Sequence, residues 1–128
     1  MNAYSAVQNY SSVKVHSGVE TASPHRLIQM LFEGALERIA QAKGAMVQKQ
    51  IARKGELISK AVAIVGGLQG SLNDKEGGAL AANLDGLYDY IIRRLSQANY
   101  ENNTEYLDEC GRLLGEIKAA WDTIGNQM

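Results

Sequence analysis

The chain has 128 residues, of which 45% are hydrophobic, and carries a formal net charge of −1 with a sequence pI of about 6.1. This length fits one domain that buries roughly two-thirds of its unfolded surface. The near-neutral charge gives no electrostatic case for binding nucleic acid or an anionic membrane. Cys110 is the single cysteine, which excludes a disulfide within the chain. The single proline and the lack of alternating apolar and polar residues favour an all-α protein.

Residues 1–22 carry a helical pattern that several serines dilute. We expect a short mobile N-terminal helix or arm, followed by a linker, that is marginal alone and needs a surface to dock on. Its docking side chains would be Tyr4, Val7 and Tyr10. The segment has no basic start and no apolar run, so it does not match a secretory signal.

The stretch from Ser23 to Met46 predicts the first long helix. Ser23 can cap the helix by accepting a bond from a backbone N–H, and Pro24 suits the first turn. At about 100° per residue, Leu27 lies at the edge of the apolar face and Met30 lies nearly behind it. The face itself consists of residues spaced by three and four: Ile28, Leu31, Phe32, Ala35, Leu36, Ile39, Ala42 and Met46.

A second helix is predicted over residues 51–72, with a broad apolar face on one side. The other side carries Ala63, Gly66, Gly67 and Gly70. Each glycine costs a helix about 1 kcal/mol relative to alanine. The cluster is therefore either a tolerated weakness or local bend, or a smooth surface that another helix approaches closely.

Residues 73–78 predict a turn, and the third helix follows over about 79–100. Tyr90 lies off its core face, which comprises Leu80, Leu84, Leu87, Tyr88, Ile91, Ile92, Leu95 and Ala98. Asn102 and Glu105 have the spacing of a capping box, which would start a fourth helix with an apolar stripe up to Ile124. Four amphipathic helices joined by short turns predict an antiparallel up-down-up-down four-helix bundle over residues 23–124, with 125–128 as a short tail.

Residues that could support catalysis, bind a metal ion or bind a phosphate group are scarce. His16 and His25 are the only histidines, and neither belongs to a metal-binding motif. The glycines of residues 66–70 lack the lysine of a phosphate-binding loop. Cys110 lies within an apolar stripe and is interpreted as a small core residue. We therefore predict no enzymatic activity, no metal and no cofactor.

Apolar side chains remain after the core faces are assigned, which indicates a surface for an amphipathic partner helix, shielded by the N-terminal arm. A closed bundle without such a surface is the alternative. The predicted partner-binding residues are Tyr4, Val7, Tyr10, Leu27, Met30, Gly66, Gly70 and Tyr90.

Several motifs support a family resemblance. They are V-E-T-A-S-P at residues 19–24, L-I-Q-M-L-F-E-G-A at 27–35 and N-L-D-G-L-Y-D-Y at 83–90, with Trp121 in the last helix. In this order they resemble the flagellar secretion chaperones specific for flagellin, the FliS family, over essentially the whole chain. The chain departs from the family pattern at His25, where an acidic residue is usual, and at Gly66, where a bulkier residue is expected.

The resemblance implies a cytoplasmic, non-enzymatic four-helix bundle. It implies binding to the C-terminal segment of newly made flagellin, prevention of premature polymerisation, and export through the flagellar type III apparatus. Export-gate components are a second candidate partner, and the free protein would be a monomer or weak dimer. A dimerising helical adaptor or regulatory bundle that uses the same surface for itself is the alternative function.

Overall fold

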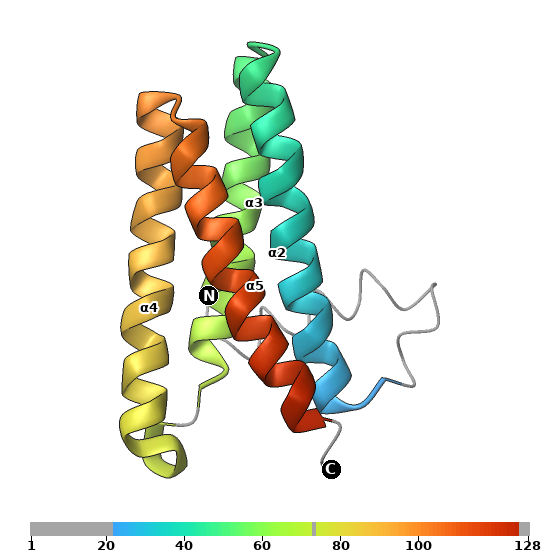
Figure 1. The fold of residues 1–128 in the computed structure, drawn as a ribbon, viewed down its shortest axis with the longest axis vertical. Helices are drawn as coiled ribbons and strands as arrows, with labels where there is room; N and C mark the ends of the chain where they lie inside the picture. Colours follow the sequence, from blue (N-terminus) through green and yellow to red (C-terminus); the bar gives the residue numbers. More distant parts are fainter. Residues whose placement is uncertain (1–21, 73, 126–128) are drawn as a thin grey trace.

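The computed structural model describes residues 22–72 and 74–125, and this part of the chain contains four helices and no strand. The helices are α2 (Pro24–Val47), α3 (Ile51–Gly70), α4 (Asp74–Glu101) and α5 (Thr104–Gly125). They alternate in direction, and the α2–α3 and α4–α5 turns lie at the same end, at the top of Figure 1. The predicted antiparallel four-helix bundle is confirmed. The predicted arm falls almost entirely outside the described residues.

Local sequence signals start α2 as predicted. The Ser23 side chain accepts a hydrogen bond from the backbone nitrogen of Arg26 at 3.1 Å, and Pro24 is the first helical residue. The helix ends at Val47, and Lys49 then adopts a φ of 60° in the turn to α3. The first helix is therefore encoded by residues adjacent in the sequence.

The capping residue of α5 differs from the prediction by one position. Asn103 Oδ1 accepts bonds from the backbone nitrogens of Glu105 at 2.9 Å and Tyr106 at 3.3 Å. Asn102, the predicted cap, has a φ of 53°, a left-handed conformation that asparagine tolerates better than most residues. Its side chain accepts a bond from Lys54 of α3 instead, at 2.5 Å. The Asn102 side chain, which the local pattern assigned to the cap of α5, is thus engaged in a tertiary contact with α3.

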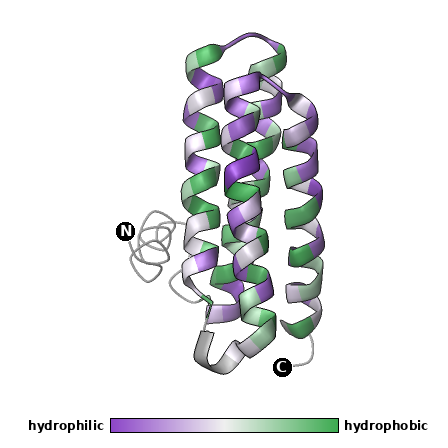
Figure 2. Cartoon of the chain, turned by 90° about the vertical axis from the view of Figure 1, so that its left-hand side faces the viewer, coloured by the Kyte–Doolittle hydropathy of each residue, from purple (hydrophilic) through white to green (hydrophobic). Residues whose placement is uncertain are grey.

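The core runs along the centre of the bundle. Figure 2 shows hydrophobic and hydrophilic residues alternating around each helix, as expected for amphipathic helices that share one core. None of the described helices is both long and apolar enough to cross a membrane. The largest fully buried side chains are Phe32, Leu31, Leu68, Ile91, Leu95, Leu107, Leu114, Val65 and Cys110.

The buried side of α2 is wider than predicted. Met30 is buried, with 9% of its surface exposed, so the expectation that it lies off the packed side is wrong. At about 100° per residue, the buried positions from Phe32 through Ala35 and Gly34 to Met30 span more than half of the helix circumference. The reason is that α2 packs against both α3 and α5, whereas the sequence pattern predicts a single packed face.

Candidate functional site

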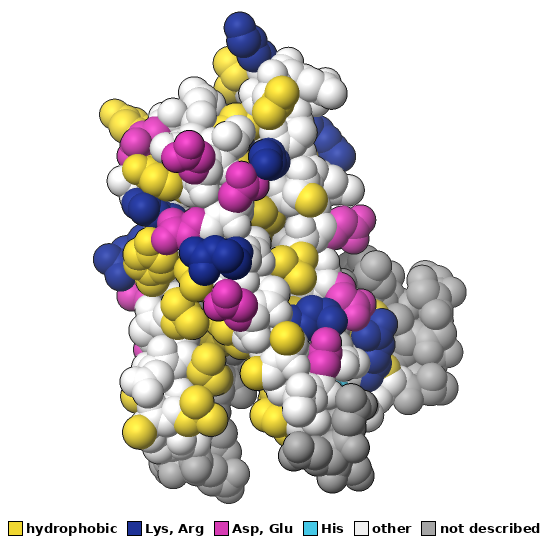
Figure 3. Space-filling model, in the orientation of Figure 1, with side chains coloured by type: hydrophobic (Ala, Val, Ile, Leu, Met, Phe, Trp, Pro, Cys, Tyr) yellow, Lys and Arg dark blue, Asp and Glu magenta, His cyan; other side chains and the backbone are white. Residues whose placement is uncertain are grey.

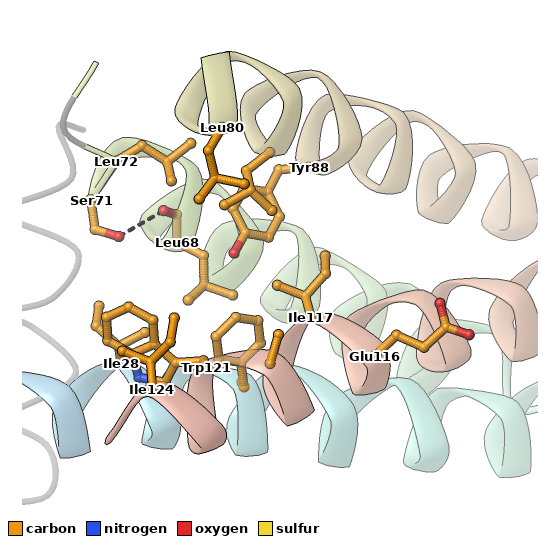
Figure 4. Close-up of a pocket in the computed structure, with 13 residues that line it drawn as sticks. Ile28, Leu68, Ser71, Leu72, Leu80, Tyr88, Glu116, Ile117, Trp121 and Ile124 are labelled. Carbon is orange, nitrogen blue, oxygen red and sulfur yellow. Dashed lines mark hydrogen bonds between the residues drawn. The ribbon is translucent and has the colours of Figure 1, made fainter. Parts of the chain in front are cut away.

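An apolar pocket of about 510 Å³ lies at the end of the bundle where α2 and α4 begin and α3 and α5 end. Figure 4 shows the side chains of Leu72, Leu80 and Tyr88 on one side of the hollow, facing Ile28 and Trp121 on the other. The described lining residues are Ile28, Phe32, Leu68, Ser71, Leu72, Leu80, Leu84, Tyr88, Glu116, Ile117, Ala120, Trp121 and Ile124. All four helices contribute to this pocket.

The start of α4 leaves this end of the bundle open. Gly78 interrupts the helix with φ 55° and ψ −130°, a conformation that glycine adopts without steric cost. A Cβ atom added to Gly77 would lie 2.5 Å from the Cβ of Ala81, so the backbone also needs glycine there for close approach. Leu80 follows this bend and is 66% exposed, although the sequence placed it on the core face. The bend therefore turns a predicted core position into a pocket rim.

The pocket surface is almost uncharged. Glu116 is the only charged side chain among its described lining residues. Ser71 Oγ donates to the carbonyl of Leu68 at 2.7 Å, which satisfies the hydroxyl within its own turn. Burial raises the pKa of Tyr88 to about 12, so its ring lines the pocket as a neutral group at physiological pH. The site suits apolar side chains of a ligand far better than charged ones.

The same end of the bundle is visible on the molecular surface. In Figure 3, hydrophobic side chains border a hollow in the lower part of the molecule, between the start of α4 and the end of α5. Ile124, from the end of α5, is 45% exposed although the sequence placed it in the apolar stripe. Such an exposed apolar hollow is typical of a protein-interaction site.

Comparisons with known proteins agree on one family. A family model described as "Flagellar protein FliS" matches residues 6–128. The flagellar secretion chaperone FliSB of Pseudomonas aeruginosa is 51% identical over 126 residues, which cover 98% of this chain and 100% of the relative. The flagellar secretion chaperones FliS of Vibrio cholerae and Salmonella typhimurium are 44% and 43% identical over 119 and 125 residues. These alignments cover 93% and 97% of this chain, and 88% and 93% of the two relatives.

The chain belongs to the FliS family. The resemblance inferred from the sequence motifs is therefore confirmed. These relatives in the FliS family are named flagellar secretion chaperones.

In this FliS-family bundle none of the predicted partner-binding residues within the described part of the chain lines the pocket. Leu27 is half-buried near the start of α2, and Met30 is buried. Gly66 is half-buried and Gly70 is exposed, both on α3, whereas Gly67 of the predicted glycine side is buried. Tyr4, Val7 and Tyr10 lie outside the described residues. The pocket is thus a second surface that the sequence analysis did not identify.

Tyr90 belongs to a polar network between α4 and α5. Its hydroxyl donates to Glu109 Oε2 at 2.7 Å, and Arg94 Nε donates to Glu109 Oε1 at 2.7 Å. The Arg94 guanidinium also lies over the ring of Tyr106, 3.8 Å from its centroid. The hydrogen bond from Arg94, and to a smaller extent the one from Tyr90, holds the pKa of the Glu109 carboxyl below its ordinary value. Tyr90 is therefore half-buried by a tertiary contact instead of standing free on the surface.

Two sequence features could have indicated the pocket. The Gly77–Gly78 pair shows that α4 cannot continue straight to its first residue. The apolar stripe of α5 extends to Ile124, which lines the pocket and is 45% exposed. Helical periodicity places the apolar lining residues on core-facing positions, and it does not show which of those positions stay uncovered.

The described residues contain no group of three or more His, Cys, Asp or Glu side chains placed to hold a metal ion. Cys110 is fully buried, and burial raises the pKa of its thiol to about 12. A buried thiol with so high a pKa is a poor nucleophile. The interpretation of Cys110 as a core residue is confirmed.

Proposed function

We propose that the chain is a cytoplasmic export chaperone that binds the C-terminal segment of flagellin, prevents its premature polymerisation and supports its export by the flagellar type III secretion system. The observation that carries this proposal is the apolar pocket, open at one end of a bundle of the FliS family. The names of the relatives support the chaperone role, and the pocket supplies a place for apolar side chains of a client.

The physical chemistry of the pocket suits an amphipathic client segment. A segment that folds only against its neighbours in a filament exposes apolar side chains while it is alone. Burying those side chains contributes roughly 25 cal/mol per Å² of apolar surface, part of which offsets the entropy lost on ordering. The pocket falls within the volume range of about 300–1,000 Å³ that is usual for ligand sites.

The first 18 residues complete this proposal as a displaceable cover. They would dock on the bundle through Tyr4, Val7 and Tyr10, and flagellin would displace them. Few apolar side chains support this docking, so a longer client segment would compete successfully. A chain lacking residues 1–18 is then expected to bind a flagellin peptide at least as tightly as the full chain. Weaker binding would identify the arm as a contact element.

The direct test is calorimetric titration of the full chain with a peptide of the flagellin C-terminal segment. Leu80→Glu places a charge at the pocket rim and is expected to weaken binding by about tenfold or more, because the charge loses hydration when the peptide docks. Ile51→Glu is the matched control, since Ile51 is 74% exposed at the opposite end of the bundle. Both variants are expected to keep the fold.

Two results would contradict the proposal. One is equal affinity of the peptide for Leu80→Glu and wild type, which would remove the pocket from the interface. The other is self-association of the chain on gel filtration with no complex formed with the peptide, which would favour the dimerising adaptor.

A further inference from the structure

His25 and Trp121 hold the start of α2 against the end of α5. Their ring centroids lie 4.6 Å apart with an interplanar angle of 13°, so the imidazole and indole planes are stacked. Trp121 Nε1 also donates a hydrogen bond to the backbone carbonyl of His25 at 3.1 Å, across 96 residues of sequence. His25 therefore holds the plane of the indole through its ring, and the indole nitrogen through its backbone carbonyl.

The same indole forms part of the pocket. Trp121 lines the pocket, whereas His25 is absent from the lining residues. Figure 4 shows the Trp121 side chain beside Ile28 and Ile124, on the α2–α5 side of the hollow. Rotation of so large and rigid a ring would change the shape of that side. The contact with His25 thus lies behind a wall of the pocket.

We propose that His25 is a positioning residue for partner binding: its ring and its carbonyl hold Trp121 in the orientation that forms the pocket wall. The inference rests on the proposed function of the pocket as the client site. His25 does not line the pocket, but it then influences the shape of the pocket through its contact with Trp121.

The chemistry of the imidazole supports a role for its ring plane. Both ring nitrogens of His25 are buried and have no hydrogen-bond partner among the described residues. Leaving buried polar atoms unpaired is unfavourable, so hydrogen bonding by the ring does not account for its position. What the side chain contributes is a flat surface for the indole. A phenyl ring at this position supplies the same surface without the unpaired nitrogens.

A neighbouring contact provides a matched control. Gln29 Nε2 donates to Asp122 Oδ1 at 2.7 Å, and Lys118 Nζ donates to Asp122 Oδ2 at 2.7 Å. Gln29 therefore also joins α2 to α5, one turn after His25, but takes no part in the ring stack. Gln29→Ala is therefore expected to loosen this end of the bundle and to leave the stack in place.

The experiment compares the full chain with its His25→Ala, His25→Phe and Gln29→Ala variants. The chain contains one tryptophan, so its fluorescence reports on Trp121 alone. Four quantities are measured: the emission maximum, quenching by acrylamide, the affinity for a flagellin C-terminal peptide, and the affinity for the apolar dye ANS. The melting temperature of each variant accompanies them.

We expect His25→Ala to show red-shifted emission, stronger quenching and about tenfold weaker peptide binding. His25→Phe is expected to restore wild-type emission and affinity. Gln29→Ala is expected to melt at a lower temperature with unchanged emission and an affinity close to that of wild type.

Wild-type affinity of His25→Ala, or wild-type emission from it, would overturn the inference. An equal loss of affinity in Gln29→Ala would also overturn it, because general loosening would then suffice. If the peptide fails to bind the wild-type chain, the proposed function is wrong. The emission and ANS affinity then still decide separately whether His25 positions Trp121 and shapes the pocket.

Discussion

Lys54 Nζ, in the first turn of α3, donates a hydrogen bond to the backbone carbonyl of Asn99, in the last turn of α4, at 3.0 Å. The lysine is only 6% exposed and also donates to Asn102 Oδ1. A cation at a helix C-terminus satisfies carbonyls that have no intrahelical partner and complements the helix dipole. This contact therefore fixes the end of α4 to the start of α3, at the end of the bundle opposite the pocket.

Lys54→Met is expected to lower the free energy of unfolding by about 1–3 kcal/mol, because two acceptors lose their donor. Lys60→Met is the control: Lys60 is on the same helix, and its side chain is 53% exposed in an ion pair with Glu56. Its effect is expected to stay within about 0.5 kcal/mol. Urea denaturation measures both variants. Equal losses would show that Lys54 contributes no more than a surface lysine.

Glu109→Gln tests the network between α4 and α5 through its pH dependence. Arg94 and Tyr90 hold the pKa of Glu109 below its ordinary value. Such a carboxyl stabilises the fold above its unfolded pKa of about 4.3, and the contribution is lost as the pH falls through the lower folded pKa. We therefore expect the variant to melt below wild type at about pH 7.

The difference in melting temperature between wild type and Glu109→Gln should shrink as the pH is lowered toward about pH 3. Glu101→Gln, at an exposed position in the last turn of α4, is the control and should follow wild type throughout. A difference that stays constant across this range would show that the charge of Glu109 is not responsible.

Gly66 and Gly78 are expected to respond in opposite directions to alanine. A Cβ atom at Gly66 meets nothing within 4 Å, so Gly66→Ala should stabilise α3 by up to about 1 kcal/mol. Gly78 has a φ of 55°, so Gly78→Ala should cost about 1–2 kcal/mol through backbone strain. Thermal unfolding distinguishes them, and destabilisation by Gly66→Ala would contradict the open space at that position.

The larger Gly66→Leu change tests the glycine side of α3 as a client surface. We expect it to weaken binding of the flagellin peptide without loss of stability, because the side chain obstructs close approach of a helix. Calorimetry and melting temperature are measured on the same sample. Wild-type affinity would assign the glycine cluster to a tolerated weakness of the helix.

Leu95→Ala and Leu84→Ala separate the closed core from the pocket. Leu95 is fully buried, and its truncation should cost about 2–5 kcal/mol through cavity formation. Leu84 is half-buried and lines the pocket, so its truncation should cost less but should weaken peptide binding. Stability and affinity are measured for both variants. A larger stability loss for Leu84→Ala would mean that the pocket is closed in solution.

Much of the fold follows from local sequence. Ser23 and Pro24 start α2 because a side-chain acceptor and a preset φ act within one turn. The four apolar stripes determine which sides turn inward, because burial follows helical periodicity. The family motifs likewise lie in order along the chain and needed no structure to be recognised. Cys110 was assigned to the core by its place in one such stripe, and the structure agrees.

The cap of α5 and the pocket depend instead on tertiary contacts. Asn103 caps α5 in place of the predicted Asn102, whose side chain accepts a hydrogen bond from Lys54, 48 residues away. Trp121 faces a pocket and a histidine 96 residues away instead of a closed core. Periodicity says which side of a helix is apolar, but it does not say where along its length a neighbouring helix begins or bends. The pocket depends on that longitudinal relation among four helices, which is set by packing between residues distant in the sequence.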